Sequence, residues 1–278
     1  MTTSASLAQR LGYGPEDRLL IVNCDDLGSS HSANTAIEAA MRRGIATSAT
    51  LMVPCPWAPE AVELCKDLDV GVHLTLTAEY PGYRWRALTA AASLHNGLGF
   101  MPLTAEGVWA RADPADVRAE CHAQIDQALA WGVDVTHLDT HMGVMQMDPR
   151  FFEIYLDLAV DYGLPLRMLS DNYARKLGFP IREAALERGV LFVDHFIAPP
   201  WGAPAQAPFI DKVPRLRPGV SEIFLHPVED GPELRAYDLA QPDLRAADGA
   251  FLLGPEARAS VDGIELISFR KLRDLQRA

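Results

Sequence analysis

The chain has 278 residues, of which 49% are hydrophobic and 22% charged, a balance that is typical of soluble globular proteins with a sizeable core. Its formal net charge of −12 argues against nucleic acid and against an anionic membrane as the main partner, because both require clustered Lys and Arg. No stretch of about 18 apolar residues occurs, so we expect no membrane span. No secretory h-region is visible near the start of the sequence either.

After an N-terminal lead-in over residues 1–17, short apolar runs alternate with amphipathic stretches. The apolar runs predict strands at 18–23, 47–53, 70–76, 133–139, 165–169, 190–196, 220–226 and 263–269. The amphipathic stretches predict helices at 34–43, 58–67, 114–131 and 149–162. Gly44, Gly132 and Gly163 mark three of the helix ends, and Pro114 lies near one helix start.

Repeated strand–helix alternation predicts an α/β fold with mainly parallel strands. The number of units favours a (β/α) TIM-like barrel over an open sheet, and no linker divides residues 1–278, so we expect a single domain. Two stretches, 78–112 and 197–218, break the alternation and predict irregular loop insertions near a site. Tyr80, Trp85 and Trp109 in the first loop suit stacking on a sugar or another ring, although plain loop packing explains them equally well.

The four cysteines form no CxxC pair and no recognisable disulfide frame, which favours reduced thiols and a cytoplasmic location. Cys24 lies beside an acidic pair and could act as a nucleophile. The simpler interpretation is a small strand residue that points away from Asp25.

The acidic pair, Asp25 and Asp26 in "NCDDLG", follows the first predicted strand. Two adjacent carboxylates repel each other unless a cation or hydrogen bonds intervene. A strand-to-helix turn with an Asp N-cap is one explanation, and a functional site is the other.

Polar residues at the ends of other strands favour the site. His73 lies late in the third strand, His226 ends "EIFLHP", and the segment "THLDTHMG" holds His137, Asp139 and His141 on one face of an extended chain. In parallel α/β folds such strand ends meet at one edge. Two imidazoles and one carboxylate with open positions suit a catalytic divalent metal, which activates water and polarises a carbonyl.

The motifs "LLIVNCDDLG", "GVHLTLT", "THLDTHMG", "LPLR", "EIFLHP" and "GIELISFRKL" occur in this order from about Arg18 to Leu272. In this ordered set the chain resembles the YdjC-like carbohydrate deacetylases of the ChbG/HpnK type. The resemblance implies a distorted (β/α) barrel, often a homodimer, that uses one divalent metal ion to remove acetyl groups from N-acetylated sugars. Mg²⁺ or Zn²⁺ is expected, and Mn²⁺ or Co²⁺ would also suit.

The resemblance also implies a role for each matching residue. Asp26, His73 and His141 would bind the metal. Asp25 would be the general base, His226 the general acid, and Arg167 would orient Asp25 or the substrate. His137 and Asp139 would fix the ring of His141. The choice of His141 over His137 as ligand comes from the family pattern, since spacing alone does not distinguish them.

Two departures from the family pattern indicate a divergent branch. Typical members read "HxDSHxHxH", whereas this chain has Gly143 and Met145 in place of the later histidines, so we expect a less polar pocket floor. Typical members also read "ADDFG", and this chain has Leu27 in place of Phe.

Alternative functions fit part of the same pattern. A metal-dependent amidohydrolase acting on a non-sugar amide, or a metal-dependent sugar isomerase, would use the same ligands. A metal- or sugar-binding protein without activity would not need Asp25 and His226.

Overall fold

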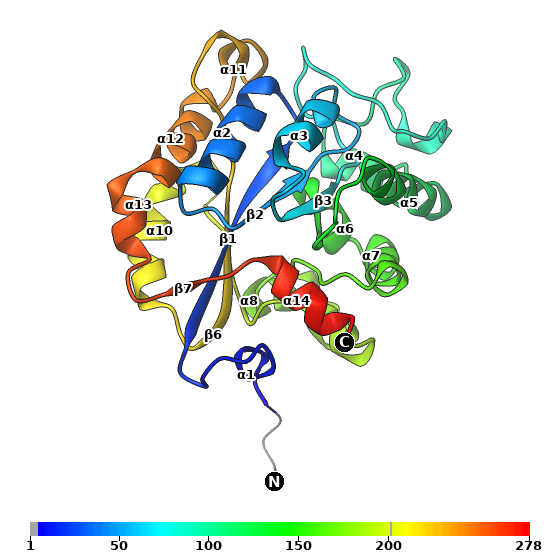
Figure 1. Cartoon of the computed structure of the whole chain (residues 1–278). Helices are drawn as coiled ribbons and strands as arrows, with labels where there is room; N and C mark the ends of the chain where they lie inside the picture. The colour runs from blue at the N-terminus through cyan, green and yellow to red at the C-terminus, as the bar shows by residue number, and fades with distance from the viewer. Residues whose placement is uncertain (1–4, 201) are drawn as a thin grey trace.

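Seven strands form one sheet in the computed structural model, which describes residues 5–200 and 202–278 (Figure 1). The strands are β1 (Arg18–Leu27), β2 (Ser48–Leu51), β3 (Val70–Leu74), β4 (Leu138–Thr140), β5 (His195–Ile197), β6 (Gly219–Leu225) and β7 (Glu265–Leu266). Their order is β4-β3-β2-β1-β6-β5, with β7 also paired to β1. All these pairings are parallel, so the carboxyl ends of the strands meet at one edge.

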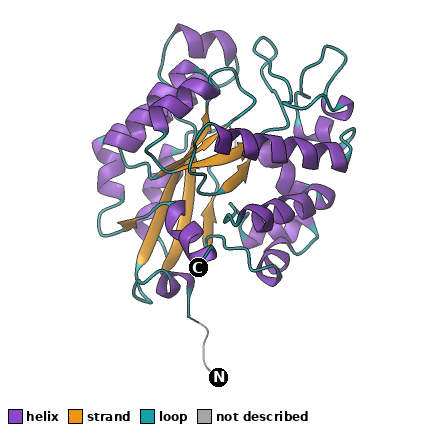
Figure 2. Ribbon diagram, turned by 45° about the vertical axis from the view of Figure 1, so that its right-hand side comes forward, coloured by secondary structure: helices purple, strands orange, loops and turns teal. Residues whose placement is uncertain are grey.

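Helices surround the curled sheet (Figure 2). They are α1 (Leu7–Arg10), α2 (His31–Arg43), α3 (Ala58–Cys65), α4 (Ala105–Trp109), α5 (Pro114–Ala130), α6 (Val144–Met147), α7 (Pro149–Tyr162), α8 (Asp171–Leu177), α9 (Ile181–Glu187), α10 (Gln206–Lys212), α11 (Pro232–Tyr237), α12 (Pro242–Leu253), α13 (Pro255–Ser260) and α14 (Phe269–Gln276). Short 3₁₀ turns occur at η1 (Ala92–Leu94), η2 (His141–Gly143) and η3 (Val213–Arg215). Among the described residues, no helix has both the length and the apolar character that crossing a membrane requires.

The α/β fold is a distorted TIM-like barrel with parallel strands, as predicted. Its distortion lies between β4 and β5. The predicted strand at 165–169 makes one bridge there, between Leu138 and Leu166, and the Leu166 N–H donates to the Leu191 carbonyl oxygen at 3.0 Å. These isolated contacts join β4 to the segment that leads into β5.

The two predicted loop insertions contain short helices. Segment 78–112 includes η1 and α4, and segment 197–218 includes α10 and η3. The lead-in contains α1, held by a capping box at Ser6. Residues 1–4 of the lead-in and Trp201 of the second insertion lie outside the described residues.

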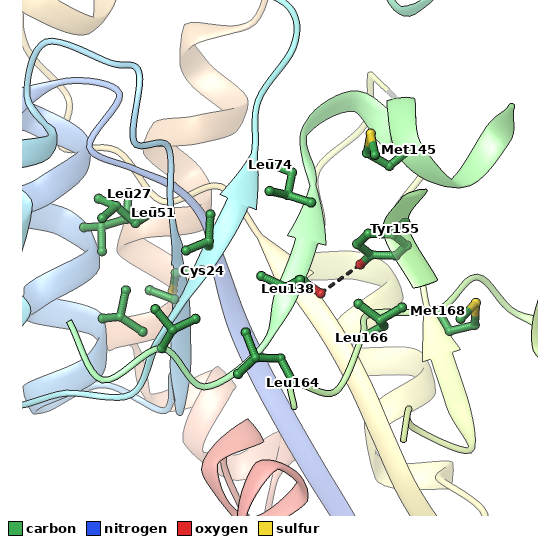
Figure 3. Packing of buried hydrophobic residues seen from close by; sticks show 14 of the residues in the cluster. Cys24, Leu27, Leu51, Leu74, Leu138, Met145, Tyr155, Leu164, Leu166 and Met168 are labelled. Carbon is green, nitrogen blue, oxygen red and sulfur yellow. Dashed lines mark hydrogen bonds between the residues drawn. The ribbon is translucent and has the colours of Figure 1, made fainter. Parts of the chain in front are cut away.

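Side chains of β1 alternate between the barrel interior and the layer of helices. Leu19 and Ile21 pack in a cluster with Phe269 of α14, near the amino end of the strand. Leu20, Val22 and Cys24 belong to the main core, part of which is drawn in Figure 3. The alternation predicts that Asn23 and Asp25 continue the face of Leu19 and Ile21 toward the carboxyl end. The interior therefore changes from apolar to polar along this strand.

Local capping fixes where the helices around the sheet begin. Ser30 accepts a hydrogen bond from the Ala33 N–H at the start of α2. Asp113 and Asp148 do the same for the first turns of α5 and α7, each followed by Pro at the first helical position. Gly163 ends α7 with φ 60°, a left-handed conformation that glycine adopts without strain.

Candidate active site

The backbone at the end of β1 turns both carboxylates of the acidic pair into the barrel. Asp26 has φ 68°, and the register with β2 shifts between Cys24 and Leu27. In a regular strand Asp25 and Asp26 would point to opposite faces. The left-handed residue breaks that alternation, and both side chains are buried within the polar cluster.

Three side chains from separate strand ends form a triangle of potential metal ligands. The Asp26 Oδ1 atom lies 3.4 Å from His73 Nε2 and 3.3 Å from His141 Nδ1. The two nitrogen atoms are 3.2 Å apart. A cation bound at about 2.0–2.1 Å in tetrahedral geometry separates its ligand atoms by about 3.3–3.4 Å, so this triangle has the dimensions of one tetrahedral face.

Each of the three potential ligand residues also makes a hydrogen bond to a charged partner outside the triangle. Asp139 Oδ1 accepts a hydrogen bond from His73 Nδ1 at 2.5 Å, and Glu79 Oε2 accepts one from His141 Nε2 at 2.9 Å. Arg245 Nη1 donates to Asp26 Oδ2 at 2.7 Å. These contacts leave Asp26 Oδ1 without a hydrogen-bond partner among the described residues, although the atom is buried. An orphaned carboxylate oxygen facing two imidazoles fits a divalent cation.

A second cluster, made of Asp25, His73 and Asp139, fits a cation less well. Asp139 Oδ2 already accepts from Thr50 Oγ1 at 2.9 Å and lies 2.8 Å from Arg167 Nη1. Arg167 Nη1 contacts both Asp25 Oδ2 and Asp139 Oδ2, and its positive charge would repel a metal ion bound between these carboxylates.

Both terminal nitrogen atoms of the Arg167 guanidinium donate hydrogen bonds to the Asp25 carboxylate. Nη1 donates to Oδ2 at 2.6 Å and Nη2 donates to Oδ1 at 2.8 Å, while Asn23 Nδ2 donates to Oδ1 at 2.8 Å. Burial by itself raises the pKa of Asp25, but Arg167 outweighs burial, and the net pKa is below its ordinary value. Asp25 is therefore a carboxylate at neutral pH.

A buried carboxylate behind Arg167 completes this arrangement. Arg167 Nε donates to Glu222 Oε1 at 2.7 Å, on β6. Burial raises the pKa of Glu222 to about 7 against the opposing effect of Arg167. Glu222 thus orients the guanidinium group of Arg167 toward Asp25.

His226 lies directly after β6, next to the acidic pair. Its backbone N–H donates to Asp248 Oδ2 at 3.0 Å, and its ring meets the Phe224 ring edge-on with centroids 5.4 Å apart. Burial lowers the pKa of His226, so its imidazole is neutral in the resting protein.

The two candidate ligand histidines carry protons in the metal-free chain. Burial lowers the pKa of His73, but Asp139 and Asp26 together outweigh it and raise the pKa to about 9. For His141, Glu79 and Asp26 likewise outweigh burial and raise the pKa to about 10. Both imidazoles would exchange a proton for a metal ion.

The structure does not bring His137 to the ring of His141. His137 stacks on Phe269 with centroids 3.8 Å apart, and its Nδ1 lies 3.0 Å from Thr136 Oγ1. Burial lowers its pKa well below the ordinary value. Asp139 is in the cluster, but its carboxylate holds His73, and the ring of His141 is held by Glu79 instead.

The loop aromatics expected to stack on a sugar are largely packed into the protein. Trp85 is 3% exposed, and its indole N–H donates to the Thr77 carbonyl oxygen at 2.8 Å. Trp109 donates to the Val144 carbonyl oxygen at 3.1 Å. Tyr80 contacts the Tyr237 ring and lies under the guanidinium of Arg245, which is 5.9 Å from the Tyr80 ring centroid and donates to Asp26.

Cys24 lies among the apolar core residues drawn in Figure 3. Strand alternation places it on the face of β1 opposite to that of Asp25. Burial raises the pKa of its thiol well above the ordinary value. The thiol is neutral and inaccessible, which leaves it no part as a nucleophile.

Sequence reasoning missed three charged residues of the site: Glu79, Glu222 and Arg245. Glu79 follows β3 closely in "LTLTAEY", so its position after a strand end was a usable signal. Glu222 is an isolated acidic residue inside a predicted strand, which is itself a sign of a paired buried charge. Arg245 lies on α12, where nothing in the helical pattern distinguishes it from a surface arginine.

The chain is similar in sequence to proteins that are already known. The YdjC-like protein family matches residues 19–262. A carbohydrate deacetylase of Thermus thermophilus is 34% identical over 276 residues, covering 96% of this chain and 98% of that protein. One of Geobacillus stearothermophilus is 32% identical, covering 93% and 99%.

A solved structure is similar over nearly the whole chain. The crystal structure of a candidate cellobiose-phosphate cleavage protein from Enterococcus faecalis superimposes with a TM-score of 0.80 at 25% identity, covering 92% of this chain and 99% of that one. The match of the family over residues 19–262 and the full-length relatives lead to one conclusion: the chain belongs to the YdjC-like protein family.

Proposed function

We propose that this protein is a metal-dependent hydrolase that removes the acetyl group from an N-acetylated amino sugar or a related sugar conjugate. The observation that carries the proposal is the ligand triangle of Asp26, His73 and His141 beside an ionised Asp25. The names of full-length relatives, carbohydrate deacetylase, support the substrate class.

Asp26 Oδ1, His73 Nε2 and His141 Nδ1 would hold the metal ion. Two imidazoles and one carboxylate form a donor set that zinc accepts, and Mg²⁺, Mn²⁺ and Co²⁺ are the other candidates. When bound, the ion supplies Lewis acidity, which activates a water molecule and polarises the acetamide carbonyl.

Asp25 would accept the proton of the attacking water. Its Oδ1 atom accepts two hydrogen bonds, whereas Oδ2 accepts one among the described residues, from Arg167 Nη1. Oδ2 therefore has a lone pair to spare for a proton. Arg167 would keep the carboxylate ionised and correctly oriented.

His226 would donate a proton to the departing amine. Because its ring is neutral at rest, His226 would first have to take up a proton, the one that Asp25 removes from the attacking water. The lowered pKa would then make the charged ring give that proton readily to the amine. Cleavage of the amide bond would then yield acetate and the free amino sugar.

The direct test is acetate release from the disaccharide of N-acetylglucosamine, with and without a chelator. We expect the zinc-loaded protein to release acetate and the stripped protein to lose that activity, with recovery on adding metal back. Asp25→Asn should keep the metal and lose about 10²–10⁴-fold in turnover, because it removes the base. Wild-type turnover in Asp25→Asn would refute the assignment of the base, and full activity after stripping would refute the metal dependence.

A further inference from the structure

A pair of phenylalanine rings lines the barrel interior beside the proposed general acid. Phe224 is on β6 and Phe196 is on the neighbouring strand β5. The two rings are nearly parallel, with an interplanar angle of 10° and centroids 5.6 Å apart. Both side chains are partly exposed, unlike the buried loop aromatics Tyr80 and Trp85.

The pair lies against the residues that the mechanism uses. Strand periodicity places Glu222, Phe224 and His226 on one face of β6, and the Phe224 ring contacts the His226 ring. The guanidinium of Arg167 lies 4.8 Å from the Phe224 centroid and 5.7 Å from that of Phe196. An accessible aromatic surface is thus next to both the amine-protonating residue and the holder of the base.

We propose that Phe196 and Phe224 form the subsite that receives the sugar ring of the substrate. This inference rests on the proposed deacetylation and names the group that binds beside His226. The acetamide is attached directly to a ring carbon, so the sugar ring must lie next to the residue that protonates its nitrogen. Sugar rings present an apolar C–H face, and an aromatic surface with a few polar groups around it is the kind of wall that orients such a ligand.

The test measures binding in the absence of turnover, on the zinc-loaded Asp25→Asn protein. Calorimetry with the disaccharide of N-acetylglucosamine should show affinity weaker by about fivefold or more in Phe224→Leu and in Phe196→Leu, since Leu keeps apolar volume and loses the ring. Phe224→Tyr, which keeps the ring, should stay within about twofold of the parent. N-acetylethanolamine, which has the amide and no ring, should bind the parent and the Leu variants equally.

Phe179→Leu is the matched control, because Phe179 is also partly exposed but lies between α8 and α9, in contact with the Phe152 ring at 5.8 Å. Thermal unfolding and zinc affinity, measured on every variant, identify any loss due to misfolding; a misfolded Leu variant is replaced by Phe→Met at the same position.

The outcomes separate the two claims. Unchanged sugar affinity in both Leu variants, with acetate release intact in the wild type, would overturn the subsite and leave the deacetylation standing. Ring-dependent sugar binding in a protein that releases no acetate would support the subsite and refute the proposed reaction. Equal weakening of the disaccharide and of N-acetylethanolamine would also overturn the subsite.

Discussion

Asp26 shows how one residue's backbone serves the chemistry of its side chain. Its φ of 68° lies in the left-handed region, which costs most residues about 1 kcal/mol or more, and which Asp and Asn tolerate better than others. The conformation turns Asp26 to the same side as Asp25. Arg167 pairs with the Asp25 carboxylate and Arg245 pairs with the Asp26 carboxylate. These two positive charges offset the repulsion between the two carboxylates.

Glu79 is predicted to set the orientation of the His141 ring. Its Oε2 atom accepts from His141 Nε2 at 2.9 Å, which turns the Nδ1 atom toward Asp26 and His73. Glu79→Ala should weaken zinc binding by about 10- to 100-fold, and Glu79→Gln, which keeps an acceptor, should weaken it less. Competition with a chromogenic chelator measures both.

The control for this series is Glu63→Ala, because Glu63 pairs with Lys66 on the exposed side of α3. It should bind zinc like the wild type. If Glu79→Ala also binds zinc with wild-type affinity, Glu79 has no part in holding His141.

Residues at strand ends were predictable from sequence, because parallel strands deliver their carboxyl ends to one place. This reasoning made Asp25, Asp26, His73 and His226 candidates and did not distinguish between His137 and His141; the structure brings Asp26, His73 and His141 together. The same reasoning could not find Arg245, whose contact with Asp26 depends on how α12 docks against the barrel. It also could not foresee that His137 would stack on Phe269 near the far end of the chain.

At the scale of elements, β3 approaches the segment before β4 unusually closely at Gly71. A Cβ atom at Gly71 would lie 2.5 Å from His137 Nδ1 and 2.6 Å from the His137 carbonyl oxygen. Gly71→Ala should therefore lower the free energy of unfolding by about 1–3 kcal/mol, measured by urea unfolding. Gly82→Ala is the matched control, since nothing lies within 4 Å of a Cβ there, and it should be nearly neutral.

A Gly71→Ala protein as stable as the wild type would mean that the His137 segment moves freely away from β3. That outcome would contradict the close packing of this part of the barrel.

The order and type of the main elements were predictable, because the buried strands are short apolar runs and the long helices α2, α5 and α7 begin at capping residues. Strand lengths were not. Residues 133–139 were expected to form one strand, and β4 covers only Leu138–Thr140. The Thr136 N–H still donates to the Val70 carbonyl oxygen, and the Val72 N–H donates to the His137 carbonyl oxygen, each at 3.0 Å. The apolar pattern therefore predicts which residues are buried here better than it predicts which residues form a regular strand.

For the whole molecule, the raised pKa values of His73 and His141 link metal binding to pH. Their acidic neighbours raise the pKa of His73 to about 9 and that of His141 to about 10, which favours the protonated rings at pH 7, and a bound cation needs the ring lone pairs. The facing atoms His73 Nε2 and His141 Nδ1 are within hydrogen-bond distance at 3.2 Å, so zinc binding at pH 7 should release at least one proton from this pair of rings. Calorimetry in buffers of different ionisation enthalpy measures this number, and a release near zero would contradict the ligand assignment.

The same groups set a pH dependence for the metal-free protein. Folded pKa values above the ordinary value of about 6.5 mean that the folded chain binds more protons than the unfolded chain. The stability that the two imidazoles contribute is fully present below about pH 6.5 and is lost as the pH rises through about 9–10. Metal-free protein should lose stability over this window, and zinc-loaded protein should not, as urea unfolding at a series of pH values would show.

The most direct test of the central claim is an anomalous-difference map, recorded at the zinc edge from crystals grown with one equivalent of zinc. We expect one peak, within bonding distance of Asp26 Oδ1, His73 Nε2 and His141 Nδ1. A peak bound by Asp25 and Asp139, or no peak in the barrel, would contradict the account.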